Sequence, residues 1–104
     1  MYIAMNRFKV QKGMESDFED IWKNRESKLD QMQGFRTFHL LRGPENEAEN
    51  YTLYASHTVW ETQDDFIAWT KSQSFRDSHK NAGTGKVTTM GHPQFEGFSP
   101  VEGA

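Results

Sequence analysis

The chain is organised around residues 66–79, which read Phe-Ile-Ala-Trp-Thr-Lys-Ser-Gln-Ser-Phe-Arg-Asp-Ser-His. Phe66 and Trp69 are three residues apart and share a helical face, as Phe75 and His79 do at a spacing of four. On one straight helix, Trp69 and His79 would lie about 80° out of phase and about 15 Å apart. They can line one pocket only if the chain bends between them. The serines within 72–74 favour such a break because their side chains compete for backbone hydrogen bonds. The pattern predicts a helix, a bend and a second short helix.

The sequence on both sides of this stretch predicts four strands and one more helix. Alternation and β-forming residues indicate strands over 2–10, 35–42, 51–60 and 94–101. Apolar residues at steps of three and four predict a helix over 15–32, and Thr62 with Asp65 begins the helical stretch that contains Trp69. Residues 43–50 form an acidic loop and residues 84–93 a glycine-containing loop. The order β-α-β-β-α-β predicts an α+β, ferredoxin-like fold with one domain over residues 1–104.

The predicted sheet has one face without a covering layer. Helices cover one side of such a sheet, yet the strand over 51–60 carries apolar residues on both faces. An exposed apolar sheet face usually needs a partner. We therefore expect a homodimer in which two sheets face each other, a dimeric α/β barrel.

Composition narrows the class of protein. The net charge of −3 argues against a nucleic-acid binder. The chain has no cysteine, which excludes a disulfide scaffold, thiolate metal sites and a cysteine nucleophile. No apolar run approaches about 18 residues, so no membrane span is predicted. The first ten residues lack the apolar core of a signal peptide, and we expect a cytoplasmic protein.

Two polar residues stand at positions patterned for the core. Asn6 shares a face of the first strand with Tyr2, Ala4 and Phe8, and a polar residue in a core pattern is often functional. The alternative is that Asn6 bonds a neighbouring backbone group or a buried water. Arg25 lies within the apolar stripe of the first helix. It either lays its stem over the core with a solvated head, or meets an anionic ligand.

The histidines differ in their suitability as ligands. His39 and His57 lie in predicted strands, where packed and hydrogen-bonded histidines are commoner, and His92 lies in a loop. His79 comes at a predicted helix end, where free carbonyls can fix its tautomer and aim the other nitrogen outward. No second histidine or carboxylate cluster accompanies it, so zinc and non-haem iron are poorly supported. A single axial histidine suits haem, whose porphyrin supplies four ligands, and a structural histidine is the alternative.

The chain resembles the IsdG-type haem-degrading monooxygenases of the antibiotic-biosynthesis-monooxygenase superfamily over essentially its whole length. The resemblance is strongest at Phe66, Trp69, Ser72, Phe75 and His79, and further matches are Asn6-Arg7, Lys12-Gly13, Gly34-Phe35 and Thr58-Val59-Trp60. Residues 38–44 and 92–98 are similar to the rhizobial-type branch involved in bacterial haem uptake. The family's catalytic asparagine, tryptophan and histidine correspond to Asn6, Trp69 and His79.

The resemblance implies a haem-degrading monooxygenase, for which haem is both cofactor and substrate. His79 would bind the iron on one side of the porphyrin, and Asn6 would donate a hydrogen bond on the other as O2 is activated. Trp69 would press the ring out of plane, Arg25 would meet a propionate, and Phe66 and Phe75 would pack on the haem. The reaction needs O2 and an external electron donor, and it releases iron. Two alternatives stay open, a cofactor-free oxygenase of an aromatic or quinol substrate and a non-enzymatic haem-binding protein.

Overall fold

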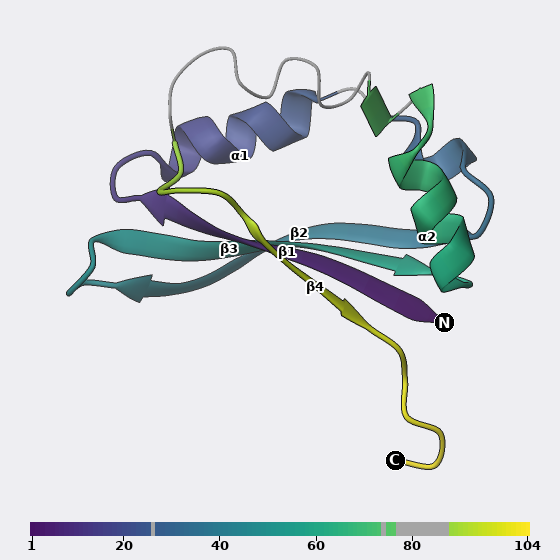
Figure 1. Cartoon of the computed structure of the whole chain (residues 1–104). Helices are drawn as coiled ribbons and strands as arrows, with labels where there is room; N and C mark the ends of the chain where they lie inside the picture. The colour runs from purple at the N-terminus through teal and green to yellow at the C-terminus, as the bar shows by residue number, and fades with distance from the viewer. Residues whose placement is uncertain (26, 74, 77–87) are drawn as a thin grey trace.

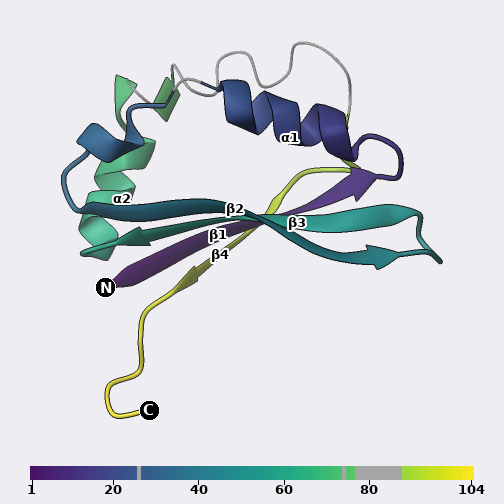
Figure 2. The ribbon, with the colours of Figure 1, turned by 180° about the vertical axis from the view of Figure 1, so that it is seen from behind.

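The computed structural model describes residues 1–25, 27–73, 75–76 and 88–104. In chain order, the elements are β1 (Tyr2–Gln11), α1 (Glu15–Asn24), a 3-10 turn η1 (Leu29–Gln31), β2 (Phe35–Asn46), β3 (Tyr51–Trp60), α2 (Gln63–Thr70) and β4 (Gln94–Phe98). Both helices lie on the same side of the sheet, α1 over one end and α2 over the other (Figure 1). The reverse view shows the same separation of the two helices (Figure 2).

The sheet has the order β2-β3-β1-β4, and every pairing between these strands is antiparallel. This is the ferredoxin-like arrangement, so the predicted fold class is confirmed. β1 and β3 pair without interruption from Tyr2 opposite Trp60 to Gln11 opposite Tyr51. Because the side chains alternate between faces along this regular pair, its register decides which residues meet beneath the helices.

The core beneath the helices consists of two separate clusters. One, which we call the α2 cluster, contains Tyr2, Ala4, Leu29, Trp60 and Trp69. The other, the α1 cluster, contains Val10, Phe18 and Tyr54, with partly buried neighbours that include Phe8 and Trp22. Ring pairs dominate both, which agrees with a chain that is 13% aromatic although its mean hydropathy is −0.88.

The predicted first helix is too long. It was expected over 15–32, but α1 ends at Asn24, and Arg25 has an extended conformation with φ −71° and ψ 128°. The apolar residues of the predicted stripe belong to different clusters: Phe18 and Trp22 lie in the α1 cluster, and Leu29 and Met32 in the α2 cluster. A straight helix cannot reach both, so the chain turns away after Asn24.

The predicted start of the second helix and the break after it are confirmed. The Thr62 hydroxyl accepts a hydrogen bond from the Asp65 amide at 3.1 Å and caps α2. After α2 the Ser72 hydroxyl donates to the Trp69 carbonyl at 2.7 Å and accepts from the Phe75 amide at 3.1 Å. This hydroxyl therefore joins the end of α2 to the next helical residues, as expected of serine at a helix boundary.

Three strand ends also differ from those predicted, and β1 ends one residue later than expected, at Gln11. β2 continues beyond residue 42 into the acidic segment, with a register shift between Arg42 and Glu45. Pro44 lies within this irregularity, where a residue without an N–H is tolerated in a strand. β4 ends at Phe98, before the predicted 101. In the described part of the chain, every helix is too short or too polar to cross a bilayer.

Candidate functional site

Asn6 occupies a polar gap between the two core clusters. It lies in the centre of the sheet on β1, opposite Ser56 of β3 and Phe95 of β4. Its side chain is half-buried. It faces the helices, because it shares a face of β1 with Ala4 and Phe8, which pack in the α2 and α1 clusters. Among the residues that the structure describes, none forms a hydrogen bond with the Asn6 side chain. The amide therefore keeps its donors and acceptor for another partner.

The predicted aromatic residues of the site meet in the α2 cluster. Trp69 is buried, with its ring 6.4 Å from Trp60 and 5.4 Å from Phe75, which stands edge-on. Phe66 stacks on Phe95, with ring centroids 5.6 Å apart and planes 7° apart. Since Phe95 lies opposite Asn6, these rings form the wall of the cluster nearest to the amide.

Arg25 lies directly after α1, at the C-terminal cap of the helix. Its guanidinium carbon is 4.4 Å from the centre of the Trp22 ring, a cation–π contact. Burial lowers the pKa of Arg25, because the charged form loses hydration. Within the described part of the chain no carboxylate pairs with this cation. The guanidinium itself packs on the Trp22 ring, and contact of Arg25 with an anionic ligand stays a prediction.

The predicted iron ligand His79 lies outside the described residues, which stop at Arg76 and resume at Thr88. His39 and His57 face each other across β2 and β3. Because they alternate with Phe38 and Tyr54, they lie on the sheet face away from the helices. They are therefore not packed in the core between helices and sheet, where strand histidines were expected. His92 is exposed, as predicted.

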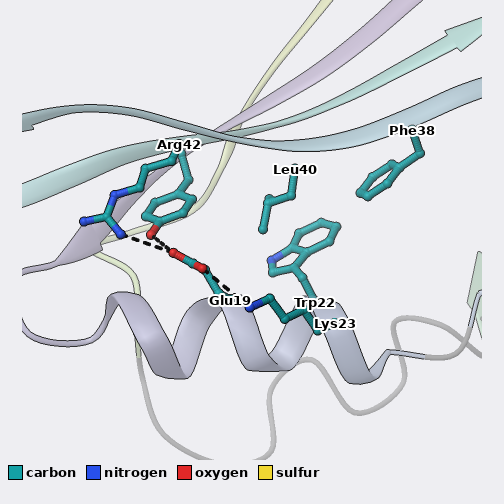
Figure 3. Close-up of a pocket in the computed structure, with 7 residues that line it drawn as sticks. Glu19, Trp22, Lys23, Phe38, Leu40 and Arg42 are labelled. Atoms are coloured by element: carbon teal, nitrogen blue, oxygen red, sulfur yellow. Dashed lines mark hydrogen bonds and ion pairs between the residues drawn. The ribbon is translucent and has the colours of Figure 1, made fainter.

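A groove that sequence reasoning missed lies between α1 and the strands β2 and β3 (Figure 3). Its volume is about 450 Å³, within the range of small-molecule pockets. Its lining residues are Glu19, Trp22, Lys23, Phe38, Leu40, Arg42 and Tyr54. Neither Asn6 nor Trp69 lines this groove, so it is distinct from the predicted site. The alternating spacing of Phe38, Leu40 and Arg42 was the available signal, but only the fold brings α1 beside it.

Charged and polar groups at one end of the groove are already paired with one another. The Glu19 carboxylate accepts a hydrogen bond from the Tyr54 hydroxyl, and Arg42 Nη1 lies 3.3 Å from Glu19 Oε2. The hydrogen bond from Tyr54 holds the pKa of Glu19 below its usual value. Burial and the same hydrogen bond raise the pKa of Tyr54 to about 12. These groups connect α1 to the sheet, and their charges compensate each other.

The described arrangement offers an unpartnered amide, a half-buried cation and flat aromatic walls. No group of three or more histidine, aspartate or glutamate side chains that could hold a metal occurs within the ranges the structure describes. The amide can stabilise charge that develops on a bound molecule, and the cation can meet an anionic substituent. This combination suits a large, flat, anionic ligand.

Comparison with known proteins finds similarity to oxygenases. The family model described as "Antibiotic biosynthesis monooxygenase" matches residues 1–81. A protein of Staphylococcus haemolyticus named "Heme oxygenase (staphylobilin-producing)" is 33% identical over 81 residues, which cover 78% of this chain and 75% of the relative. A protein of the same name from Staphylococcus saprophyticus is 29% identical over 80 residues, 77% of this chain and 74% of the relative.

Proteins whose solved structures have the same fold are named for different chemistry. The heme degrader MhuD from Mycobacterium tuberculosis, with two hemes in its active site, has a TM-score of 0.74 at 22% identity and covers 100% of this chain and 99% of its own. SnoaB from Streptomyces nogalater, a cofactor-independent oxygenase, has a TM-score of 0.70 at 18% identity, with 97% of this chain and 93% of its own covered. The fold alone therefore does not choose between them. The family match over residues 1–81 and the identity to the staphylococcal relatives together establish that the chain belongs to the antibiotic biosynthesis monooxygenase family.

Proposed function

We propose that this protein is a haem-degrading monooxygenase, with haem bound on the helix side of the sheet near Asn6. The observation that carries the proposal is the half-buried Asn6 amide, which has no hydrogen-bond partner among the described residues and lies between two aromatic clusters. The names of the staphylococcal relatives support haem as the substrate class. The expected placement in the rhizobial-type branch of the family stays a prediction.

The described residues fit an iron porphyrin. Phe66 and Phe75 offer ring surfaces for the macrocycle, and Trp69 packs between Trp60 and Phe75 beside them. Arg25 offers a cation, without a carboxylate partner in the described part, to a propionate. His79 is the proposed axial ligand, on the strength of the family resemblance. Haem, when bound, supplies the iron at which O2 and electrons from an external donor are combined.

The residues of the chain have separate tasks in this proposal. The Asn6 amide donates a hydrogen bond to the reacting oxygen and stabilises the negative charge that develops there. Trp69 is held rigidly by its buried ring contacts, so it can press on a flat ligand without yielding. Arg25 fixes the orientation of the substrate through one propionate. Held in this way, haem would present a meso carbon for oxidation by O2 with electrons from an external donor, which would open the ring and release iron.

The test is aerobic turnover of the haemin complex. Haemin is titrated into the apo protein, and a Soret band that saturates at one haem per chain is expected. Reductant and air should then bleach this band and yield an open-chain tetrapyrrole that mass spectrometry identifies. A stable Soret band would indicate a haem carrier. Absence of tight haem binding together with O2 uptake on an aromatic substrate would indicate a cofactor-free oxygenase.

Two substitutions with matched controls assign the roles. Asn6→Ala should keep the Soret band and lose most of the turnover, since removal of one such donor typically costs about 100-fold or more. Asn24→Ala is its control, because Asn24 bonds only the Asp20 carbonyl on α1 among the described residues. His79→Ala should change the Soret spectrum, and His92→Ala should not. An unchanged spectrum and turnover in His79→Ala would refute the axial ligand.

The protein is further proposed to act as a homodimer with two sheets face to face. The face away from the helices carries apolar side chains that a single chain leaves exposed, among them Leu41 at 41% and Phe98 at 45%. A second copy of the same face would cover them. A cytoplasmic location and the need for an external electron donor stay predictions.

A further inference from the structure

Ser56 is a second polar residue in the gap between the two core clusters. It lies on the interior strand β3, opposite Asn6 on one side and Leu40 on the other. On this strand the helix-facing residues are Thr52, Tyr54, Ser56, Thr58 and Trp60. Ser56 is 7% exposed and lies along the strand between Tyr54 of the α1 cluster and Trp60 of the α2 cluster.

Among the described residues, the other hydroxyl groups on the helix-facing side of β3 have hydrogen-bond partners, and that of Ser56 has none. Thr52 Oγ1 donates to Glu15 Oε2 at 2.8 Å, Thr58 Oγ1 donates to the Ala4 carbonyl at 3.2 Å, and Tyr54 donates to Glu19. No described residue forms a hydrogen bond with the Ser56 hydroxyl. Polar side chains of residues this well buried are usually hydrogen-bonded within the protein. Among the described residues, the Ser56 hydroxyl therefore keeps its donor and acceptor for a partner above the sheet.

The Ser56 oxygen also retains access to the space above the sheet. Among the described residues, the one fully enclosed side-chain polar atom without a partner is Trp60 Nε1. The unpartnered Ser56 oxygen is therefore not sealed within the core. Directly opposite residues of antiparallel strands have Cβ atoms about 4.5–5.5 Å apart, so rotation of the Asn6 and Ser56 side chains can bring their polar ends together.

We infer that Ser56 is a positioning residue for Asn6, an inference that rests on the proposed function. The Asn6 amide has a donor end and an acceptor end, and its partner decides which end faces the substrate. When the Ser56 hydroxyl donates to Oδ1 of Asn6, the Nδ2 hydrogens point toward the haem side. This is the orientation that a hydrogen bond to the reacting oxygen requires. Without the hydroxyl, either end of the amide can face the substrate.

The C–O stretching frequency of carbon monoxide bound to ferrous haem reports on this hydrogen bond. A donor near the outer oxygen lowers the frequency, because it draws electron density into the antibonding orbital of the bond. Ser56→Ala should keep the Soret band, raise the frequency toward that of Asn6→Ala and lower turnover about fivefold to tenfold, the equivalent of one hydrogen bond. Ser56→Thr, which keeps a hydroxyl, should restore both.

Thr58→Val is the matched control. It removes a hydroxyl from the same face of the same strand, but that hydroxyl bonds the Ala4 carbonyl. Thr58→Val should lower the free energy of unfolding and leave the C–O stretching frequency unchanged. In the Asn6→Ala background, Ser56→Ala should have no further effect on turnover, because a residue that acts through Asn6 is silent without it.

The outcomes separate the inference from the proposed function. If the unsubstituted protein forms no haem complex, the proposed function fails. If it forms one and Asn6→Ala shifts the C–O frequency while Ser56→Ala does not, the positioning role of Ser56 is refuted. Equal loss of turnover from Ser56→Ala with and without Asn6 would refute it as well.

Discussion

Individual residues beneath the helices are distinguished by whether their polar atoms are paired. Glu15, Thr52 and Tyr54 are joined to partners across the interface between α1 and the sheet. Asn6 and Arg25 lack such partners within the described part of the chain, although both are half-buried. We interpret these two groups as available to a ligand, in line with the proposed function.

The role of Arg25 can be tested through the substrate's charge. Arg25→Gln should weaken haem affinity about tenfold, because one charge-assisted hydrogen bond to a propionate is lost. Equilibrium titration followed by the Soret band measures this. With haem dimethyl ester, whose propionates carry no charge, the variant and the unsubstituted protein should bind alike.

Arg36→Gln is the control for Arg25. Arg36 is an exposed arginine on β2 whose Nη2 lies 3.5 Å from Glu61. Its substitution should leave the affinity for haem unchanged. An Arg25→Gln variant that binds haem as tightly as Arg36→Gln does would contradict the propionate contact.

At the scale of elements, backbone conformation and close contacts decide where the helices lie on the sheet. The turn before β2 passes directly beneath the start of α2. Gly34 has φ +80°, and a Cβ built on it would lie 2.1 Å from Asp65 Oδ2. Asp65 itself is held by the Thr62 cap, with its Oδ2 2.9 Å from Thr62 Oγ1. The start of α2 thus depends on a residue without a side chain at position 34.

Gly34→Ala should be more destabilising than the same change at another left-handed glycine. Gly13 has φ +92° with nothing within 4 Å of an added Cβ, so Gly13→Ala measures backbone strain alone, about 1 kcal/mol. Gly34→Ala adds the collision with Asp65 and should cost about 2 kcal/mol or more in free energy of unfolding. Urea denaturation measures the free energy of unfolding of both variants. Equal losses of this free energy would show that the collision with Asp65 adds nothing to the backbone strain.

The contacts between α1 and the sheet should make stability fall in acid. The pKa of Glu19 is lowered chiefly by the Tyr54 hydrogen bond, and that of Glu15 chiefly by its own backbone amide and then by Thr52. The folded state therefore binds fewer protons than the unfolded state. The ionised glutamates stabilise the folded state fully when the pH is above their ordinary pKa of 4.5. This stabilisation is lost as the pH falls through their lower pKa values in the folded state.

Glu19→Gln tests this acid dependence. The variant should lose about 1 kcal/mol of free energy of unfolding at pH 7, and its stability should depend less on pH below 4.5. Urea denaturation at a series of pH values measures both quantities. Glu102→Gln in the exposed C-terminal segment is the control and should follow the unsubstituted protein. If the stability of Glu19→Gln fell below pH 4.5 as steeply as that of the unsubstituted protein, Glu19 would not be a source of the acid dependence.

At the scale of the whole molecule, the two faces of the sheet differ in what covers them. The helix side carries both core clusters and the polar gap. On the other side, which neither α1 nor α2 covers (Figure 1), Leu41 and Phe98 are exposed. His39 and His57 lie on that uncovered face, away from Asn6. The face is therefore suited to association and the helix side to chemistry.

Leu41→Glu should weaken the proposed homodimer at least tenfold, because the substitution introduces one charge per chain into an apolar contact. Sedimentation velocity over a concentration series measures the dissociation constant. Ile21→Glu is the control, since Ile21 is 49% exposed and lies on α1, on the opposite side of the molecule. A Leu41→Glu protein that dimerises as tightly as the control would exclude this face as the interface.

The order of elements, the bend near Ser72 and the core pattern of β1 were all readable from the sequence. They depend on local spacing and capping, and local spacing is a property of the chain itself. The end of α1 at Asn24 was not readable, because it depends on Phe18 and Leu29 belonging to different clusters. Likewise, Asn6 was conspicuous as a polar residue in an apolar pattern, whereas Ser56 gained meaning only from strand pairing. Which residues meet across strands is set by register, and register follows from the packing of the whole sheet rather than from any one segment.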